Sequence, residues 1–189
     1  MELTERKLAV VVVVVALLLV AAFVSGFAAT ESETKLETTV ITSESGELEE
    51  PDDRLALVVV GGSRLTERFD SALEDTLTDE GYDVTVEDST EEVYDSPVLV
   101  VEVTNAAVGV GFARHIAETR VLSYYSTTGN ATGYERFRET GSTVQRETGT
   151  VVMGEYRLRD TTRGFVTNRG YRGRVTETVA QEVVSRFKG

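Results

Sequence analysis

The chain has 189 residues and a formal net charge of −13, with 32 Asp and Glu against 19 Lys and Arg. That length suits one ordinary domain with attachments. Because the sequence holds no Cys and a single His, it excludes disulfide scaffolds, Cys-based zinc sites, iron–sulfur clusters, thiol nucleophiles, lipid attachment at a lipobox Cys and multi-His metal sites, and no cofactor is expected.

The choice of basic residues bears on the solvent. Sixteen of them are Arg, and only Lys7, Lys35 and Lys188 are Lys. Carboxylates keep their hydration when water is scarce, and at about 1 M salt the Debye length is only about 3 Å, so their mutual repulsion is screened. We interpret this composition as adaptation to a halophilic setting, with an ordinary acidic, soluble surface as the alternative.

An uncharged stretch of 22 residues, 8–29, follows Arg6 and Lys7. As a helix rising about 1.5 Å per residue it would be about 33 Å long, enough to cross a hydrocarbon core of about 30 Å. We therefore predict a single-pass anchor in the cell membrane, with residues 1–7 in the cytoplasm and the C-terminal domain outside it, because basic residues favour the cytoplasmic side. A cleaved signal peptide is the alternative, and it would export the same residues.

Residues 30–54 differ in composition from the residues on either side. Residues 30–53 hold nine acids against Lys35 alone, and most of the other residues are Ser and Thr. A segment with so little to bury does not offset its ordering entropy. We therefore expect an extended acidic stalk over 30–54, between the anchor and a folded domain at 55–189.

The domain at 55–189 combines strand and helix patterns. Apolar or alternating runs predict strands at 55–60, 82–87, 98–103, 120–127, 134–138 and 150–159. Helical spacing of apolar residues predicts helices at 64–80, capped by Gly81, and at about 173–187. Residues 108–111 either continue the strand before them or form a loop.

The element order β-α-β-β-β-β-β-α is that of an α+β domain. The first strand, helix and second strand form a βαβ unit, whose strands should be parallel. The strand at 98–103 should lie inside the sheet. The natural layout is one mixed β-sheet with both helices on one face, and with the other face exposed to solvent or covered by a partner.

Three stretches carry a resemblance to known envelope proteins: LTDEGYDV at 77–84, DSPVLVV at 95–101 and TETVAQEVV at 176–184. On an export signal and a stalk, this arrangement resembles the small envelope-assembly lipoproteins, nearest the lipopolysaccharide-assembly lipoprotein family and more loosely the TolB N-terminal type of fold. The three stretches are architecture more than motif, and the family's lipidated Cys is absent. The resemblance implies a non-enzymatic adaptor or chaperone of envelope components.

Three features suggest chemistry, but each has a simpler interpretation. Gly61-Gly62-Ser63 could bind an anion at a helix N-terminus, yet it lacks the GxGxxG and P-loop patterns and suits a tight turn with Ser63 as N-cap. His115 has no GxSxG motif to serve, and we interpret it as a structural residue on an exposed or half-buried loop. Paired carboxylates suit a solvated surface, and the EF-hand spacing is absent; loose calcium binding by the acidic segments stays open, but no metal site is predicted.

The charges are distributed asymmetrically along the domain. Residues 55–102 hold 13 acids and two bases, whereas residues 103–189 hold eight acids and 13 bases. Six arginines fall close together: Arg157, Arg159, Arg163, Arg169, Arg172 and Arg174. Because the guanidinium group is a planar, bidentate donor, we predict an anion-binding surface for acidic lipid headgroups, an acidic glycan or an acidic partner. The alternative is that these arginines pair with the acidic first half of the same domain.

Asn130-Ala131-Thr132 is an N-glycosylation sequon between two predicted strands, in a segment predicted to be exported. Asn130 is therefore a glycosylation candidate.

The sequence favours a membrane-anchored, extracytoplasmic binding or assembly module of the cell envelope that is not catalytic. Its partner would be an envelope protein, an acidic lipid or an acidic glycan, and not nucleic acid, because the chain is acidic and predicted to lie outside the cell. Two alternatives stay open: an extracytoplasmic hydrolase with an unrecognised site, and a structural subunit of a surface layer or filament.

Overall fold

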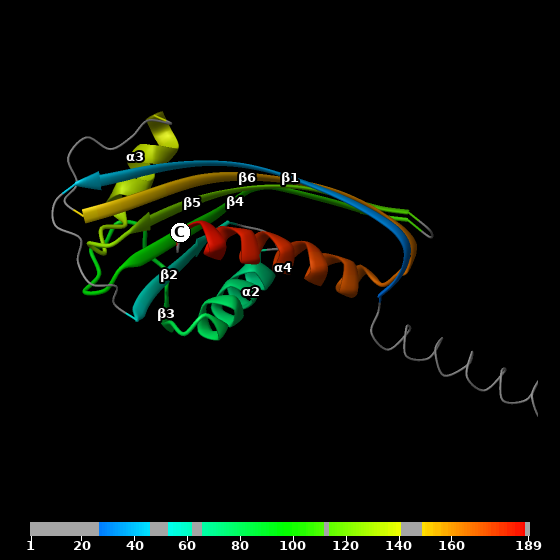
Figure 1. Cartoon of the computed structure of the whole chain (residues 1–189), viewed down its shortest axis with the longest axis horizontal. Helices are drawn as coiled ribbons and strands as arrows, with labels where there is room; N and C mark the ends of the chain where they lie inside the picture. Colours follow the sequence, from blue (N-terminus) through cyan, green and yellow to red (C-terminus); the bar gives the residue numbers. More distant parts are fainter. Residues whose placement is uncertain (1–26, 46–52, 62–65, 112–113, 141–148, 188–189) are drawn as a thin grey trace, which may run out of the picture.

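The computed structural model describes residues 27–45, 53–61, 66–111, 114–140 and 149–187. These residues form one mixed six-stranded sheet with three helices (Figure 1). The predicted α+β class and mixed sheet are confirmed.

The sheet is parallel at one end and antiparallel at the other. Its strands are β1 (Phe27–Ser45), β2 (Arg54–Val60), β3 (Asp83–Glu87), β4 (Val98–Val110), β5 (Arg114–Ser126) and β6 (Gly149–Val166). They lie in the order β1-β6-β5-β4-β2-β3. β2 pairs parallel with β3 and β4, whereas the β4–β5, β5–β6 and β6–β1 pairs are antiparallel. The predicted parallel βαβ unit and the interior place of the strand that begins at Val98 are confirmed.

Two helices cover one face of the sheet and a shorter one lies on the other. α2 (Thr66–Asp79) and α4 (Asn168–Phe187) pack side by side under the sheet, as predicted, and α3 (Thr132–Thr140) lies on the opposite side (Figure 1). None of the helices in the described part of the chain is long and apolar enough to cross a membrane.

Each helical layer has its own core. Between the sheet and the two helices, the side chains of Phe69 and Leu73 of α2 and Val179 of α4 pack against Leu57 and Val121 of the sheet. The smaller second core joins Tyr134 of α3 to one end of the opposite face. Its other buried members are Ala56, Val58, Val98, Val100, Tyr124, Ala131, Val151 and Met153. The alternation along β2 and β4, with both faces buried, accounts for their nearly continuous apolar sequences.

The stalk prediction is wrong for residues 30–45, which belong to β1. This strand pairs with β6 along its whole length, from Phe27 opposite Val166 to Ser45 opposite Gly149. The segment buries little: its backbone hydrogen bonds to β6, and Leu36 is the hydrophobic residue of β1 that packs against the main core. Ordering entropy is offset by the ladder and not by apolar burial.

The anchor prediction falls largely on residues outside those described, which begin at Phe27. Its last three residues, 27–29, are the start of β1. Residues 46–52 of the predicted stalk also lie outside the described ranges.

The strand predicted at 134–138 is wrong, because these residues lie in α3. Tyr134 and Phe137 are three residues apart, so a helix places both against the second core, where Tyr134 is fully buried. The hydroxyl of Tyr134 donates a hydrogen bond to Glu102 of β4, and Glu135 pairs with Arg138 within the helix. These contacts outweigh the weak alternating pattern.

The other elements lie where predicted: β2, β4, β6 and α4 are longer than predicted, whereas β3 and α2 are slightly shorter. β4 continues to Val110, which settles the choice left open at 108–111, and it contains a bulge between Val103 and Asn105. β5 begins six residues earlier than predicted, at Arg114, β6 continues past its predicted end to Val166, and α4 begins at Asn168. Gly81 caps α2 with a positive φ of 95°, and the amides of Gly81 and Tyr82 bond back to the last turn. Gly61 lies at the end of β2, and Ser63 is outside the described residues.

If β1 is part of the folded domain, removing residues 1–45 should destabilise it far more than removing residues 1–26. We expect the free energy of unfolding to fall by about 3 kcal/mol or more, since the hydrogen bond from Thr34 to the charged Asp160 is alone worth about 1.5–3 kcal/mol. Urea denaturation of the two fragments measures the difference. Equal unfolding midpoints for the two fragments would show that residues 27–45 do not stabilise the domain, as expected of a stalk.

Candidate functional site

The sheet separates the six candidate arginines into two groups. Arg157, Arg159 and Arg163 alternate along β6 with buried residues, so they lie on the face opposite α2 and α4. Arg169, Arg172 and Arg174 lie in the first turns of α4, on the other side of the sheet. The six residues therefore do not form one surface.

The first group belongs to a broad exposed surface, which we call the open face. The register places the side chains of β1, β6 and β5 in rows: Glu31, Arg163 and Arg114; Lys35, Arg159 and Glu118; Glu37, Arg157 and Arg120. Glu33 and Glu155 complete the set, which holds six basic and five acidic residues. The surface thus carries a net charge of +1 in a chain whose total is −13.

Every ion pair on the open face has an exposed basic partner, although the shared acid Glu155 is half-buried. Arg159 lies 3.2 Å from Glu118, Arg163 lies 2.7 Å from Glu31, and Glu155 accepts from both Arg157 and Arg120. The side chains of Arg159 and Glu118 are 73% and 53% exposed. Such pairs contribute about 0–1 kcal/mol each and exchange readily with other charges. The acidic residues of these pairs come from β1, β5 and β6. None of them lies within residues 55–102, the acidic first half of the domain with which the arginines were alternatively expected to pair.

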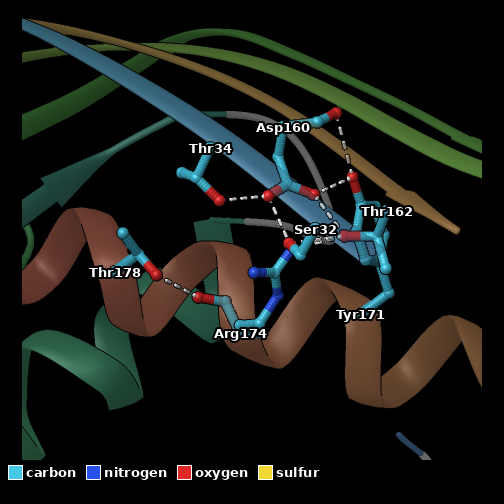
Figure 2. Close-up of polar contacts among 7 residues, drawn as sticks. All are labelled: Ser32, Thr34, Asp160, Thr162, Tyr171, Arg174 and Thr178. Carbon is cyan, nitrogen blue, oxygen red and sulfur yellow. Dashed lines mark hydrogen bonds and ion pairs between the residues drawn. The ribbon is translucent and has the colours of Figure 1, made fainter. Parts of the chain in front are cut away.

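Arg174 makes a different kind of contact, with a buried carboxylate. Asp160 of β6 is 2% exposed and accepts hydrogen bonds from Thr34 of β1, Thr162, Tyr171 and Arg174 (Figure 2). The Arg174 Nη2 to Asp160 Oδ2 distance is 2.5 Å, and the Tyr171 hydroxyl lies 2.7 Å from Oδ1. This cluster joins the edge strand, its neighbour and the first half of α4.

The hydrogen bonds determine the charge of this carboxyl group. Burial by itself would raise the pKa of Asp160, but the donors Thr34, Tyr171 and Thr162 and the positive charge of Arg174 outweigh it, so the pKa lies below its usual value. Burial and the hydrogen bond to Asp160 raise the pKa of the Tyr171 phenol. The pair is therefore ionised Asp160 with neutral Tyr171 at neutral pH, and every partner is a donor to a fixed anion.

The other two arginines of α4 do not join this cluster. Arg169 is exposed, and its backbone carbonyl accepts a hydrogen bond from Arg68 of α2 at 3.1 Å. Arg172 is half-buried, and its Nε has no partner among the described residues. Neither arrangement by itself defines an anion site.

His115 is not on a loop, as predicted, but in β5, where it is 1% exposed. Its ring lies 5.3 Å from that of Tyr171, and within the described ranges neither ring nitrogen has a hydrogen-bond partner. No Ser hydroxyl or carboxylate of those residues therefore forms a catalytic pair with it. Its buried, packed setting fits the structural role that we expected.

Asn130 lies just before α3 and is half-buried. Its Oδ1 accepts hydrogen bonds from the amide and the hydroxyl of Thr132, at 3.1 and 2.7 Å, so the sequon's own residues form an Asx turn at the start of α3. The described residues contain no group of three or more His, Cys, Asp or Glu side chains placed to hold a metal ion.

The most connected polar residue, Asp160, was missed from the sequence. Its place in the alternating run Tyr156, Leu158, Asp160, Thr162 was the available signal, since the first two residues of that run point into the core. A charged residue at a position reserved for buried side chains requires partners.

No family model and no curated protein sequence matches this chain. Solved structures that are similar to it at low identity include the following three. A point variant of the PelC dodecamer of Paraburkholderia phytofirmans is 15% identical with a TM-score of 0.46, covering 79% of this chain and 95% of that one. A second PelC dodecamer from the same organism is 16% identical, with a TM-score of 0.41 and coverages of 78% and 96%. A neuraminyllactose-binding hemagglutinin homologue of Helicobacter pylori is 10% identical, with a TM-score of 0.33 and coverages of 75% and 84%.

The buried pair predicts a pH-dependent contribution to stability. Asp160→Asn should lower the free energy of unfolding at neutral pH by about 3 kcal/mol, because it leaves a buried cation site without its anion. The folded-state pKa of Asp160 is lowered, so the unfolded chain binds more protons as the pH falls below about 4, and the wild-type advantage is lost there. Urea denaturation of both proteins between pH 2 and pH 7 measures this convergence.

Glu118→Gln is the matched control, since it removes an acid of the same sheet that pairs with Arg159 while exposed. It should change the free energy of unfolding by less than about 1 kcal/mol at any pH. Equal losses for the two substitutions would contradict the central role of Asp160.

Proposed function

We propose that this chain is a membrane-anchored, extracytoplasmic assembly module of the cell envelope, and that its open face binds an envelope protein without catalysis. The observation that carries the proposal is the open face itself. α3 covers only one end of that side of the sheet, and β5, β6 and β1 expose charged side chains over the rest.

The pattern of charges supports a protein partner over a polyanion. Each row of the open face mixes signs, so a surface of one sign would meet repulsion as well as attraction. A protein surface with its own alternating charges is complementary to such rows. Because the internal pairs are exposed, exchanging them for pairs with a partner costs little.

The proposed location rests on the sequence. Residues 27–29 belong to β1, but the uncharged residues 8–26 behind Arg6 and Lys7 still fall within the about 17–25 residues that a membrane-spanning helix needs. Their flanking charge is that of an anchor with its C-terminal side outside the cytoplasm. We extend the proposal to a halophilic setting, where the excess of acids keeps the surface hydrated. The resemblance to small envelope-assembly lipoproteins is part of the same proposal.

An acidic glycan or lipid remains a second candidate ligand for the same face. Arg157, Arg159 and Arg163 lie on one side of β6, and a chain of carboxylates with matching spacing could replace Glu118 and Glu31 as their partners. The same experiment distinguishes the two ligands.

The test is affinity purification of the tagged full-length chain from its own membranes at native salt, followed by analysis of proteins, lipids and glycans. A stoichiometric protein in the eluate is the expected result. The triple variant Arg120→Ser, Arg157→Ser and Arg159→Ser should reduce its recovery at least about tenfold, since these side chains are the centre of the open face.

The control variant removes the same charge elsewhere, through Arg136→Ser and Arg138→Ser in α3 and Arg186→Ser in α4. It should retain the partner. An eluate with no partner, or equal loss with both variants, would contradict the proposal, whereas glycan or lipid released by the open-face variant alone would replace the protein ligand by an acidic one.

A further inference from the structure

The two edges of the sheet differ greatly in length. β3 forms one edge with only five residues, whereas β1 forms the other with 19. Sheet edges carry unpaired amide and carbonyl groups, and proteins usually shorten, bend or cover them. Within the described residues, β1 pairs with β6 on one side and with no strand on the other. Proline does not occur in β1, and its one irregularity lies near its start, between Ala29 and Glu31.

The sequence of β1 is complementary to itself. In an antiparallel pair centred on Leu36, the two copies would place Lys35 opposite Glu37 twice, Glu33 opposite Thr39 and Leu36 opposite Leu36. Opposite charges and apolar residues that face each other across strands stabilise a sheet. This pairing brings no two like charges directly opposite over residues 31–41.

Neighbouring registers are less favourable. Residues that lie opposite each other in two paired strands point to the same face of the sheet. If the open faces of both copies are to lie on one side, an open-face residue of one copy must therefore lie opposite an open-face residue of the other, and the pairing must be centred on a residue and not between two residues. Centred on residue 35, Lys35 would face itself and Glu33 would face Glu37. Centred on residue 37, Glu37 would face itself, and centred on residue 34, Glu31 would face Glu37. Centred on residue 38, no opposite charges would face each other. The charges therefore favour Leu36.

We propose that a second copy of this chain occupies the outer edge of β1, antiparallel and centred on Leu36, to form one continuous sheet across two molecules. This inference rests on the proposed assembly role and names the partner at one edge of the domain. The open faces of the two copies then lie side by side, with Glu33 and Lys35 at the seam. The two Phe27 residues, at which the described residues begin, then lie at opposite ends of the paired strands.

The absence of Cys makes the register directly testable. Glu33 and Thr39 are exposed, and the proposed pair places them opposite each other across the two copies. Full-length Glu33→Cys and Thr39→Cys variants, tagged differently and expressed together in native membranes, should form a disulfide dimer on mild oxidation. Either variant expressed alone should not, because its two cysteines would lie six residues apart along the seam.

Charge exchange gives a second measurement on the full chain in detergent. Lys35→Glu and Glu37→Lys should each shift the chain toward monomer in sedimentation, because each sets like charges opposite, and the double variant should restore the dimer. Lys35 pairs only with Glu33 among the described residues, and both are about 70% exposed, so the fold itself should not change.

A mixed disulfide no stronger than that of each variant alone, or three charge variants with the same sedimentation as wild type, would overturn the self-pairing. The outcome separates this inference from the proposed function. Capture of an envelope protein without a mixed disulfide refutes only the self-pairing, and a mixed disulfide without any captured partner refutes only the open-face assembly role.

Discussion

The structure depends on one buried carboxylate. Asp160 lies in β6, and four side-chain donors from β1, β6 and α4 converge on it. Because an ionised carboxylate is costly to bury without such partners, the three elements must be in place together. The backbone ladder with β6 orders β1, and the contact with Asp160 joins that strand to the first half of α4, where Tyr171 and Arg174 reach the sheet. Together with the hydrogen bond from Thr38 to Glu182, this carboxylate connects the edge strand to the helical layer.

That arrangement determines which surfaces remain accessible. With α2 and α4 fixed on one face and α3 confined to one end of the other, the charged side chains of β5, β6 and β1 have no cover from the described helices. The edge of β1 is ordered by Asp160 from within and by β6 along its length, so it presents a long ladder of backbone groups to the outside. The same interaction therefore builds both the open face and the edge on which the proposed assembly depends.

Much of this could be predicted from the sequence, and the failures have physical causes. The apolar runs of β2 and β4 and the helical spacing in α2 report burial directly, which is why the parallel unit and the two-helix layer were predicted.

β1 was missed because its order comes from hydrogen bonds, although the β-branched run Thr38–Thr42 was a usable signal. α3 was predicted as a strand because a helix of nine residues is too short to show a clear helical period. Only the three-residue spacing of Tyr134 and Phe137 indicates it. The arginines were grouped by their distance along the chain, but the sheet lies between them. The buried state of His115 and the partners of Asp160 depend on contacts between strands far apart in sequence, which no local pattern reports.

The most direct test is carboxyl footprinting of the full-length chain in intact cells, compared with the purified Lys35→Glu variant in detergent, which is expected to be a monomer. Glu33, Glu37 and Glu118 lie on the open face or at its β1 edge, whereas Glu74 and Asp75 are exposed on α2, on the other side of the sheet. The account predicts that in cells the first three are protected several-fold while Glu74 and Asp75 are labelled as in the monomer. If each of the five residues were labelled as strongly in cells as in the monomer, the open face and the edge would have no partner, which would contradict the proposed assembly.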